Sequence, residues 1–563
     1  MRNCAAVQSK AFNIGQTLHD AMSLHRQGRL REAEKLYARA LKAAPDNFDA
    51  LHLLGLTKAQ SGDMREACRL MSSAVKINPN VPDALVNLAN VLHALERDGE
   101  ALDCLDRALA VRPGDLDAIL LRGNTLVALK RPADAVTCFQ AVLEHDSQRR
   151  DALLGRGIAY AMIGAHAEAL ADFDAMLVQT PGDPEANYNR GTALLALGRY
   201  GDALTAFDRA IASAPTHIKA WNNRGRALQA LNRHEEATAC FRQALTLDRN
   251  YADAHFNNAL SLLALGRLKE GFSEYEWRWK RTGMADLRRK YRGRLWLGEF
   301  PLDRRTILLT AEQGLGDTIQ FVRYVPLLAR SGTTVVLEVQ PELQALLGQM
   351  SGVSSCIARG ESLPRYDVYC PLGSLPHALK TEAELIPADI PYLQADAARI
   401  AKWRPSIEAL PGKRIAIAWA GHAQHANDRN RSIDLRLLES LFGMEGVSFV
   451  SIQRELRSDD ATVLESHGIT SLGPGLVDMA DTAAVTASVD LTIAVDTSVA
   501  HLAGAMGRPV WVMLPFSPDW RWTAAGERSP WYPQARLYRQ RAIGDWPNVI
   551  ASVVESLRGS RAD

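Results

Sequence analysis

A short stretch near the C-terminal end of the sequence has residues suited to binding a diphosphate. Residues 491–495 predict a buried strand. Asp496, Thr497 and Ser498 follow at the turn into an apolar helix, where free backbone N–H groups and the helix dipole attract phosphate. His501 comes one helical turn after Thr497, so we expect it to face the same loop. The pattern also fits a plain helix N-cap, because Asp, Thr and Ser are common caps.

A second loop whose residue types suit a functional site follows a predicted strand at residues 306–311. It contains Gly314, Gly316 and Asp317. Glycines let a backbone approach a ligand closely, and Asp317 begins the helix that follows. A single G-x-G is short of a full dinucleotide motif, and Asp317 also fits a helix N-cap.

Polar residues follow two further predicted strands. Arg429 and Arg431 lie in the loop at residues 421–432, and Gln453 ends the next strand. Two guanidinium groups beside a helix N-terminus can clamp a diphosphate, although solvated surface charge is the ordinary role of arginine. Trp520 and Trp522 follow a later strand and suit either the wall of a sugar or base pocket or a hydrophobic plug. No cluster has the ligand spacing of a metal site, so we expect none.

The elements that must position these loops alternate between strand and helix from about residue 303 onward. This alternation predicts parallel, doubly wound sheets in two lobes, residues 303–395 and 396–545. A linker at 286–302 precedes them, and a C-terminal helix and tail at 546–563 come after them. We expect the carboxyl ends of the strands in the two lobes to face each other across a cleft. The predicted strands are 306–311, 333–339 and 366–371 in the first lobe, and 414–421, 448–453, 491–495 and 509–515 in the second.

Residues 14–285 have a repeat of 34 residues. A small residue recurs at Ala33, Ala67, Ala101, Ala135, Ala169, Ala203 and Ala237, and a large apolar residue follows four positions later, as at Tyr37, Met71, Leu105, Phe139, Phe173, Phe207 and Phe241. The pattern resembles the tetratricopeptide repeat. It predicts an α-solenoid of about eight helix pairs, whose aromatic last unit, residues 271–279, is a cap that docks onto the next domain.

Asparagine recurs at one position of four units: Asn87, Asn189, Asn223 and Asn257. A carboxamide both donates and accepts hydrogen bonds, which suits a peptide backbone of any sequence. This series of asparagines resembles the asparagine ladder inside the repeats of O-GlcNAc transferase, and the resemblance implies an extended protein acceptor. Other units carry His19, Leu53, Leu121 and Gly155 there, so asparagine is alternatively a polar filler.

Composition and net charge argue against several classes of partner and location. The 563 residues need several domains, and a net charge of +1 gives no bulk attraction to nucleic acid or an anionic membrane. No apolar run is long enough for membrane insertion, and the N-terminal residues lack the apolar core of a signal peptide. The seven cysteines are scattered singly. These features favour a cytoplasmic protein.

The two loop motifs, Gly314-Leu-Gly-Asp317 and Asp496-Thr-Ser-Val-Ala-His501, resemble those of bacterial glycosyltransferase family 9, which includes the heptosyltransferases. The resemblance covers about residues 303–545 and implies a GT-B fold of two Rossmann-like lobes. It further implies that Asp317 is the catalytic base and that Asp496, Thr497 and His501 line a nucleotide-sugar site. The repeats fused to such a domain resemble O-GlcNAc transferases and bacterial flagellin glycosyltransferases.

Together these features predict an inverting, metal-independent glycosyltransferase that needs no cofactor. It would move a sugar from a nucleotide-sugar donor to a protein acceptor, flagellin or another surface protein, held by the repeats. Three alternatives remain open at this stage. The acceptor is a lipopolysaccharide or another glycan, the α/β half is a degenerate module in a non-catalytic repeat adaptor, or the enzyme is a sugar-nucleotide epimerase of the same fold.

Overall fold

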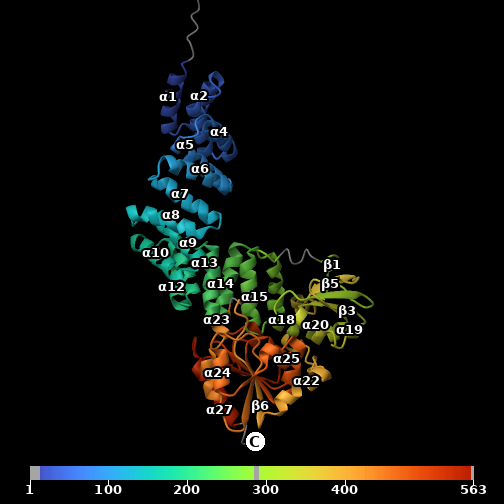
Figure 1. The fold of residues 1–563 in the computed structure, drawn as a ribbon. Coiled ribbons are helices and arrows are strands. Elements are labelled where there is room, and N and C mark those ends of the chain that lie inside the picture. The colour runs from blue at the N-terminus through green and yellow to red at the C-terminus, as the bar shows by residue number, and fades with distance from the viewer. Residues whose placement is uncertain (1–12, 285–290, 425–426, 560–563) are drawn as a thin grey trace, which may run out of the picture. The chain divides into compact units, whose positions relative to one another are not determined.

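The structure is a computed structural model that describes residues 13–284, 291–424 and 427–559. Its internal contacts divide the chain into two compact units, Met1–Pro215 and Thr216–Asp563. The ribbon in Figure 1 shows helices alone in the first unit, and helices followed by two sheets in the second. Among the described residues, no helix combines the length and the apolar character needed to cross a membrane.

The first unit consists of antiparallel helix pairs, each of which forms one repeat. The first helix of a pair has 13 residues and the second has 14, as in α1 and α2. Side chains cap several helices, as Asn47 caps α3 and Asp183 caps α11. The helices are α1 (Ile14–Arg26), α2 (Leu30–Ala43), α3 (Phe48–Gln60), α4 (Met64–Ile77), α5 (Pro82–Ala94), α6 (Asp98–Val111), α7 (Leu116–Ala128), α8 (Pro132–His145), α9 (Arg150–Met162), α10 (His166–Gln179), α11 (Pro184–Ala196) and α12 (Tyr200–Ser213).

Close helix packing inside a repeat depends on a glycine in the first helix of several pairs, as at Gly123, Gly157, Gly191 and Gly225. A Cβ atom added at Gly191 would lie 2.6 Å from Cε1 of Phe207, the buried aromatic residue of the partner helix. Gly157 has the same relation to Phe173. The two helices of a repeat therefore touch where this glycine meets the aromatic position of the sequence repeat.

The second unit begins with two further helix pairs and continues directly into the α/β region. The helices are α13 (Ile218–Ala230), α14 (His234–Leu247), α15 (Ala252–Ala264) and α16 (Leu268–Tyr275), and the 3-10 helix η1 (Glu276–Lys280) comes next. Phe272 in α16 lies edge-on to Phe321, Trp520 and Trp531 of the α/β region, with ring centroids 5.6 to 6.5 Å apart. The end of the repeat array thus shares a hydrophobic core with the sheets.

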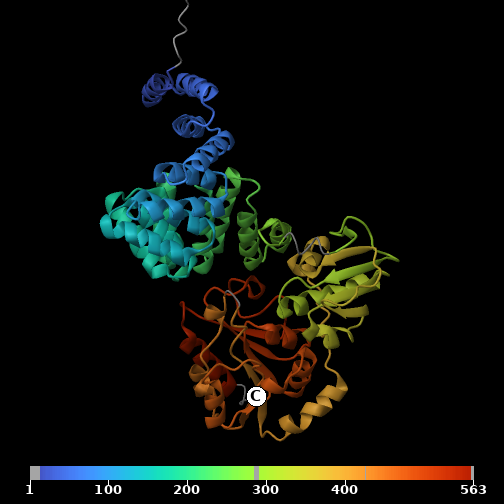
Figure 2. The same cartoon turned by 45° about the horizontal axis from the view of Figure 1, so that its top comes forward.

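Both sheets are parallel, as the alternation of strands and helices predicts. The first has the order β1-β5-β2-β3-β4 and the second β11-β10-β9-β6-β7-β8. Figure 2 shows them as separate layers, yellow-green and orange. The strands are β1 (Arg294–Leu295), β2 (Thr306–Thr310), β3 (Thr334–Val339), β4 (Val353–Ala358), β5 (Val368–Pro371), β6 (Lys413–Ala418), β7 (Val447–Ser451), β8 (Thr470–Ser471), β9 (Leu491–Val495), β10 (Val510–Leu514) and β11 (Ala535–Arg539).

Two features of the sheets differ from the expected arrangement of elements. Strand β1 lies inside the segment expected to be a linker, and it pairs with β5. Strands β4, β8 and β11 add to the predicted set. The C-terminal helix α27 (Trp546–Gly559) buries Trp546, Val549 and Val553 in the core of the second lobe.

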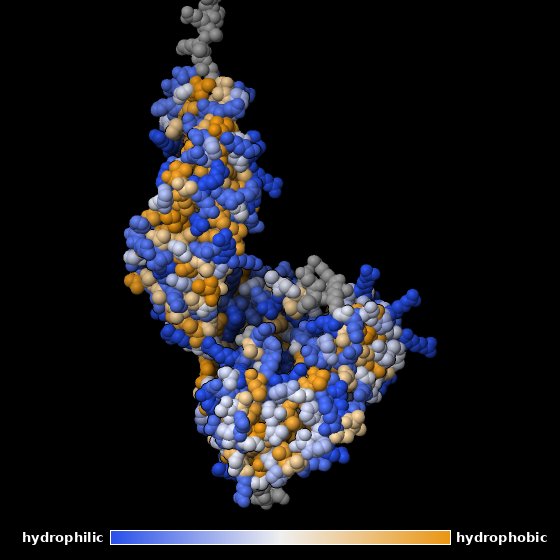
Figure 3. All heavy atoms as spheres, in the orientation of Figure 1, coloured by the Kyte–Doolittle hydropathy of each residue, from blue (hydrophilic) through white to orange (hydrophobic). Residues whose placement is uncertain are grey.

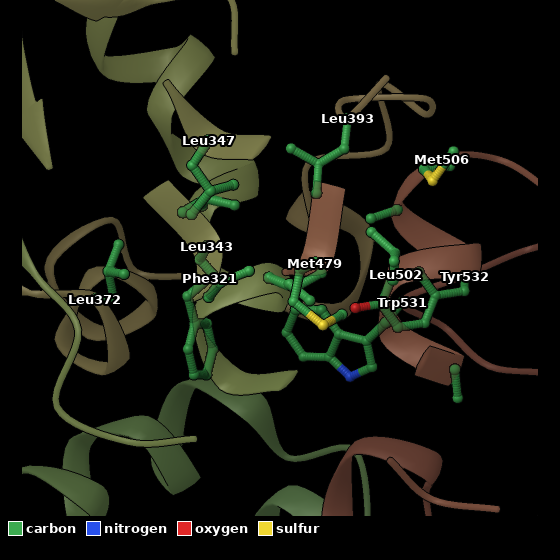
Figure 4. Close-up of a cluster of buried hydrophobic side chains, with 14 of the residues drawn as sticks. Phe321, Leu343, Leu347, Leu372, Leu393, Met479, Leu502, Met506, Trp531 and Tyr532 are labelled. Carbon is green, nitrogen blue, oxygen red and sulfur yellow. The ribbon is translucent and has the colours of Figure 1, made fainter. Parts of the chain in front are cut away.

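A continuous apolar core joins the two lobes. Helix α20 (Pro341–Leu347) of the first lobe packs against α25 (Met479–Ser488) of the second. Figure 4 shows Leu343 and Phe321 beside Met479 and Trp531 in this cluster. The lobes therefore pack tightly at this point.

The strand order places the loops of interest at the reversal points of the two sheets. In the first sheet the chain moves from β2 to β3 and β4, and later returns to the other side of β2 with β5. In the second, β6 has the corresponding position between β7 and β9. Ligands of open α/β sheets bind at the carboxyl ends of the strands next to such a reversal. The loops after β2, β5, β6 and β9 are therefore the places to look for a site.

Replacing Gly191 by Ala should destabilise the repeat array by about 1–3 kcal/mol, because the new methyl group overlaps Phe207. The matched control is Gly201→Ala in α12, where no atom lies within 4 Å of the added Cβ. That variant should be neutral or slightly more stable, since alanine favours helix. Chemical denaturation monitored by circular dichroism measures both, and equal effects of the two changes would contradict the packing argument.

Candidate functional site

The turn after β9 buries its acidic residue instead of using it as a cap. Asp496 is 8% exposed, and its carboxylate accepts a hydrogen bond of 2.7 Å from Nε1 of Trp522. Thr497 occupies the N-cap position of α26 (Ser498–Ala505) but makes no side-chain capping bond. Thr497 and Ser498 stay partly exposed at the start of the helix. Capping by side chains therefore does not explain why these polar residues occur here.

His501 is buried, whereas its spacing from Thr497 predicts that it faces the loop. Its side chain is 5% exposed, and Nδ1 lies 3.0 Å from the hydroxyl of Tyr532. Its ring centroid lies 5.0 Å from that of Trp522. Burial, helped by the charge of Arg521, lowers the pKa of His501 to about 3, so the imidazole is neutral. It contributes to the core as well as to the polar turn.

The glycine loop after β2 meets this turn. A Cβ atom added at Gly316 would lie 2.8 Å from Cδ2 of His501, so glycine is needed for the approach. Asp317, in α18 (Leu315–Phe321), accepts a hydrogen bond of 2.9 Å from the backbone N–H of Gly314. Its other oxygen forms an ion pair with Arg521. The structure thus brings both sequence motifs together, and it gives Asp317 an ionic partner besides its capping role.

Arg521 is the central cation of the site and lies outside both sequence motifs. It is 7% exposed and pairs with Asp317 of the first lobe and, at 2.8 Å, with Asp519. Although burial opposes it, the charges of Asp317 and Asp519 raise the pKa of Arg521 well above its usual range. The sequence signal for it is a charged residue between two tryptophans directly after a buried strand.

Trp520 and Trp522, on either side of Arg521, form a plug and not an open pocket wall. They lie in the 3-10 helix η7 (Trp520–Trp522) and are 4% and 0% exposed. Trp520 stacks on Phe321 and meets Trp531 edge-on, whereas Trp522 donates to Asp496. This single turn of helix therefore contacts the first lobe through Trp520 and the turn after β9 through Trp522.

The Asp496 carboxylate has an unusual electrostatic environment. Burial and the nearby charge of Asp519 raise its pKa to about 6. The hydrogen bond from Trp522 and the charges of Arg431 and Arg521 lower the pKa, but by less. A buried acid with a pKa near neutrality is typical of functional sites, although buried structural networks also produce one.

The remaining predicted residues of the second lobe separate into two groups. Arg431 donates a 3.0 Å hydrogen bond from Nη1 to the backbone carbonyl of Asp496 and packs against Gly421, which leaves room for it. Arg429, in the same short helix α23 (Asp428–Arg431), points to the exposed side and does not join the cluster. The amide of Gln453 bonds the backbone of Trp419 and Ala420, so it holds the loop after β6 in place.

The last repeat unit also reaches the glycine loop. Gln313 donates a hydrogen bond to the hydroxyl of Tyr275. Arg278, which is 1% exposed, donates to Glu312 at 2.9 Å and to Ser374 at 2.7 Å. These two partners come from the loops after β2 and β5, so Arg278 occupies the reversal point of the first sheet. A sequence repeat alone gives no signal for this contact.

The four asparagines of the proposed ladder have different surroundings. Asn87 lies 3.1 Å from Nε2 of His52, and Asn189 donates weakly to Glu185 at 3.3 Å. Asn257 donates to Asn222, and Asn223 is 6% exposed. Asn87, Asn189 and Asn257 are partly exposed and available to a ligand, whereas Asn223 is part of the buried packing.

Comparisons with known proteins identify the repeats. Residues 120–184, 180–218, 188–251 and 222–282 match the tetratricopeptide repeat model, and residues 26–108 match the model of subunit 3 of the anaphase-promoting complex, or cyclosome. A curated relative, Protein FlbA of Caulobacter vibrioides, is 27% identical over 314 residues, which cover 51% of this chain and 52% of the relative. The match thus spans about half of that protein.

Solved repeat structures align with part of the chain. A tetratricopeptide repeat protein from Parabacteroides merdae is 21% identical and covers 44% of this chain and 98% of its own, with a TM-score of 0.37. A second, from Thermus thermophilus, is 24% identical and covers 33% of this chain and 99% of its own, with a TM-score of 0.27. The chain therefore contains tetratricopeptide repeats, matched by the family model between residues 120 and 282, and an α/β region follows them.

Replacing His501 by Gln should destabilise the second unit more at pH 7 than at pH 5. The unfolded imidazole titrates near 6.5 and the folded one near 3, so the native chain loses stability as the pH falls below 6.5. Gln does not titrate, and the cost of the substitution should therefore be about 2 kcal/mol smaller at pH 5. Urea denaturation at both pH values measures the difference. An equal cost at both would mean that His501 is not buried in its neutral form.

Proposed function

We propose that the chain is a glycosyltransferase that moves a sugar from a nucleotide-sugar donor to a protein acceptor. The observation that carries the proposal is the meeting of two loops at Gly316 and His501. Each loop follows a strand next to the reversal point of its own sheet, and each contains residue types suited to this chemistry. The family 9 resemblance gives these loops the roles of base and donor site.

The donor diphosphate would bind at the N-terminus of α26, beside Thr497 and Ser498. The first turn of this helix is only partly covered, and the Arg431 guanidinium is fixed against the carbonyl of Asp496. Positive charge at this place would stabilise the departing nucleotide diphosphate. A metal ion has the same role in other transferases, so the reaction would be metal-independent.

Asp317 would act as the base that accepts the proton of the attacking hydroxyl. It comes from the first lobe, whereas the donor groups come from the second, so the acceptor would approach from the side opposite the leaving group. One displacement of that kind inverts the anomeric centre. The buried tryptophans around Arg521 would keep water from the reacting groups.

The repeats would hold the acceptor protein. Large apolar side chains remain exposed on helices of the first unit, where Figure 3 shows apolar patches among hydrophilic residues. They include Ile77, Val111, Met162, Ile163 and Val178. Together with the partly exposed amides of Asn87 and Asn189 they would offer both apolar and backbone-type contacts to a protein chain.

Two other functions make different demands on the same chain. A glycan acceptor would not need these exposed repeat positions, so transfer would be independent of the repeats. A non-catalytic adaptor would need the repeats alone, and the α/β region would neither bind nor hydrolyse a donor. Incubation of the purified chain with a panel of radiolabelled nucleotide sugars and a lysate, followed by mass spectrometry, separates the three. Sugar on protein supports the proposal, whereas sugar on glycan or no transfer contradicts it.

Asp317→Asn should lower turnover by roughly a hundredfold or more, because the amide cannot accept a proton. Asparagine still accepts the hydrogen bond from Gly314, so the start of α18 should be retained. Steady-state transfer rates and the thermal midpoint are the two measurements. Normal turnover in this variant would leave Asp317 with a structural role alone.

A chain that starts at Thr216, the first residue of the second unit, should bind and slowly hydrolyse the donor but lose transfer to protein. In the full chain, Asn87→Ala with Asn189→Ala should produce a milder loss of about thirtyfold in acceptor kcat/KM, since each of the two hydrogen bonds contributes about 1 kcal/mol. The control is Asn47→Ala, which removes a helix cap instead of a ladder amide. If the shortened chain glycosylates protein as well as the full chain does, the repeats do not hold the acceptor.

A further inference from the structure

Arg521 forms ion pairs with a carboxylate of each lobe, Asp317 and Asp519, at the point where the two candidate loops meet. We propose that it is a switchable anion ligand, which releases Asp317 and binds the diphosphate of the donor in its place. Binding of the donor would then free the base, so the donor must bind before the acceptor reacts. This inference rests on the proposed function and adds to it a positioning residue and an order of binding.

The first step of the argument is the state of Asp317. One of its oxygens accepts the backbone N–H of Gly314 at 2.9 Å, and the other is ion-paired with Arg521. A hydroxyl that is to give its proton to this carboxylate must compete with a guanidinium. Asp317 therefore needs release from Arg521 before it can act as a base.

The second step is the bonding capacity of Arg521. Its Nη1 atom donates to Asp519, its Nη2 atom faces Asp317, and Gln313 lies 3.5 Å from Nη2. Its Nε atom is buried without a hydrogen-bond partner in the described part of the chain. Once Asp317 leaves Nη2, Nε and Nη2 together can bind another anion with two parallel bonds, and phosphate fits that geometry as well as carboxylate does.

The third step is the charge balance of the site. Arg521 and Arg431 face Asp496, Asp519 and Asp317, and His501 between them is neutral. The internal carboxylates already neutralise the cations, so an added dianion would be repelled unless one carboxylate gives way. Exchange of one anion for another avoids that cost.

The fourth step identifies which carboxylate leaves. Asp519 accepts both the side chain of Arg521 at 2.8 Å and its backbone N–H at 3.0 Å, so the two are fixed within one turn. Asp496 is bonded to Trp522 in the next position. Of these three carboxylates, Asp317 is the one from the other lobe, on the short helix α18. It is the partner that can separate without unfolding the turn.

A double-mutant cycle in the full chain tests the exchange, with titration calorimetry of inorganic pyrophosphate and of a panel of nucleoside diphosphates. Asp317→Asn should tighten anion binding by about tenfold, because the competing carboxylate is gone while the cap remains. Arg521→Gln should weaken it by about tenfold or more. In the Arg521→Gln background, Asp317→Asn should have no further effect.

The matched control is Asp478→Asn. Asp478 also caps a helix, α25, and also pairs with an arginine, Arg399, but it lies away from Arg521. It should leave anion affinity unchanged. Arg521→Lys, which keeps the charge and loses the planar fork, should bind with intermediate affinity, and circular dichroism should show that each variant is folded.

Three outcomes would overturn the exchange: Asp317→Asn weakens or does not change anion affinity, the two substitutions act additively, or no probe binds to the wild-type chain. These outcomes are separate from failure of the proposed function. Anion binding that obeys the cycle, without any sugar transfer, would leave the exchange standing and remove the transferase. If the chain transfers sugar but the two substitutions act additively, the transferase stands and the exchange at Arg521 is wrong.

Discussion

The interaction on which the α/β region depends is the buried contact of Arg521 with carboxylates from both lobes. A charge removed from water costs several kcal/mol unless it is paired and hydrogen-bonded, so the two lobes cannot separate here without exposing or stranding it. The surrounding side chains fit this requirement. Trp520 packs on Phe321 of the first lobe, and Trp522 occupies the space beside His501. The polar cluster is thus enclosed by aromatic rings that fix its geometry.

The compact unit that contains the sheets begins at Thr216 and so includes the last two helix pairs. In the last pair, Arg278 occupies the position at which the two preceding pairs carry Ala210 and Ala244, and it reaches the loops after β2 and β5. Arg278 is buried only because Glu276, Glu312 and Ser374 surround it. If the last repeat were removed, Glu312 would lose its cation, and burial already raises the pKa of Glu312. The last repeat is therefore part of the scaffold of the glycine loop.

Sequence patterns predict the parts of the fold that repeat or that alternate strongly. The 34-residue period locates the helix pairs, because the large apolar position recurs where the two helices of a pair touch, as Phe207 does against Gly191. Buried strands such as β9 are evident from continuous apolar residues. The strands β4 and β11 escape the pattern, because β4 carries two successive exposed serines and β11 carries two arginines. Strand β8 has two residues, too few for any period.

Local sequence patterns locate only some residues of the candidate site, for a physical reason. A turn after a buried strand can be located from local pattern, and Asp317, Asp496 and His501 do lie beside such turns. Which polar groups meet across the two lobes depends on packing, which local pattern does not contain. Arg429 and Arg431 are two residues apart and look equivalent in the sequence, yet it is Arg431 that reaches Asp496, because Gly421 leaves space on one side of α23.

Packing also decides what His501 can do. An imidazole with a pKa of about 3 carries no charge at neutral pH, so it cannot attract a diphosphate by charge. Its ring instead supports Gly316 on one side and Trp522 on another, and its Nδ1 atom lies at hydrogen-bond distance from Tyr532. Under the proposed function, the positive charge beside the diphosphate would then come from the arginines, and of Arg431 and Arg521 it is Arg521 that also contacts Asp317. His501, which matches a binding motif, lies between the lobes against Gly316 and Trp522, and the cation that would attract the diphosphate lies outside both motifs.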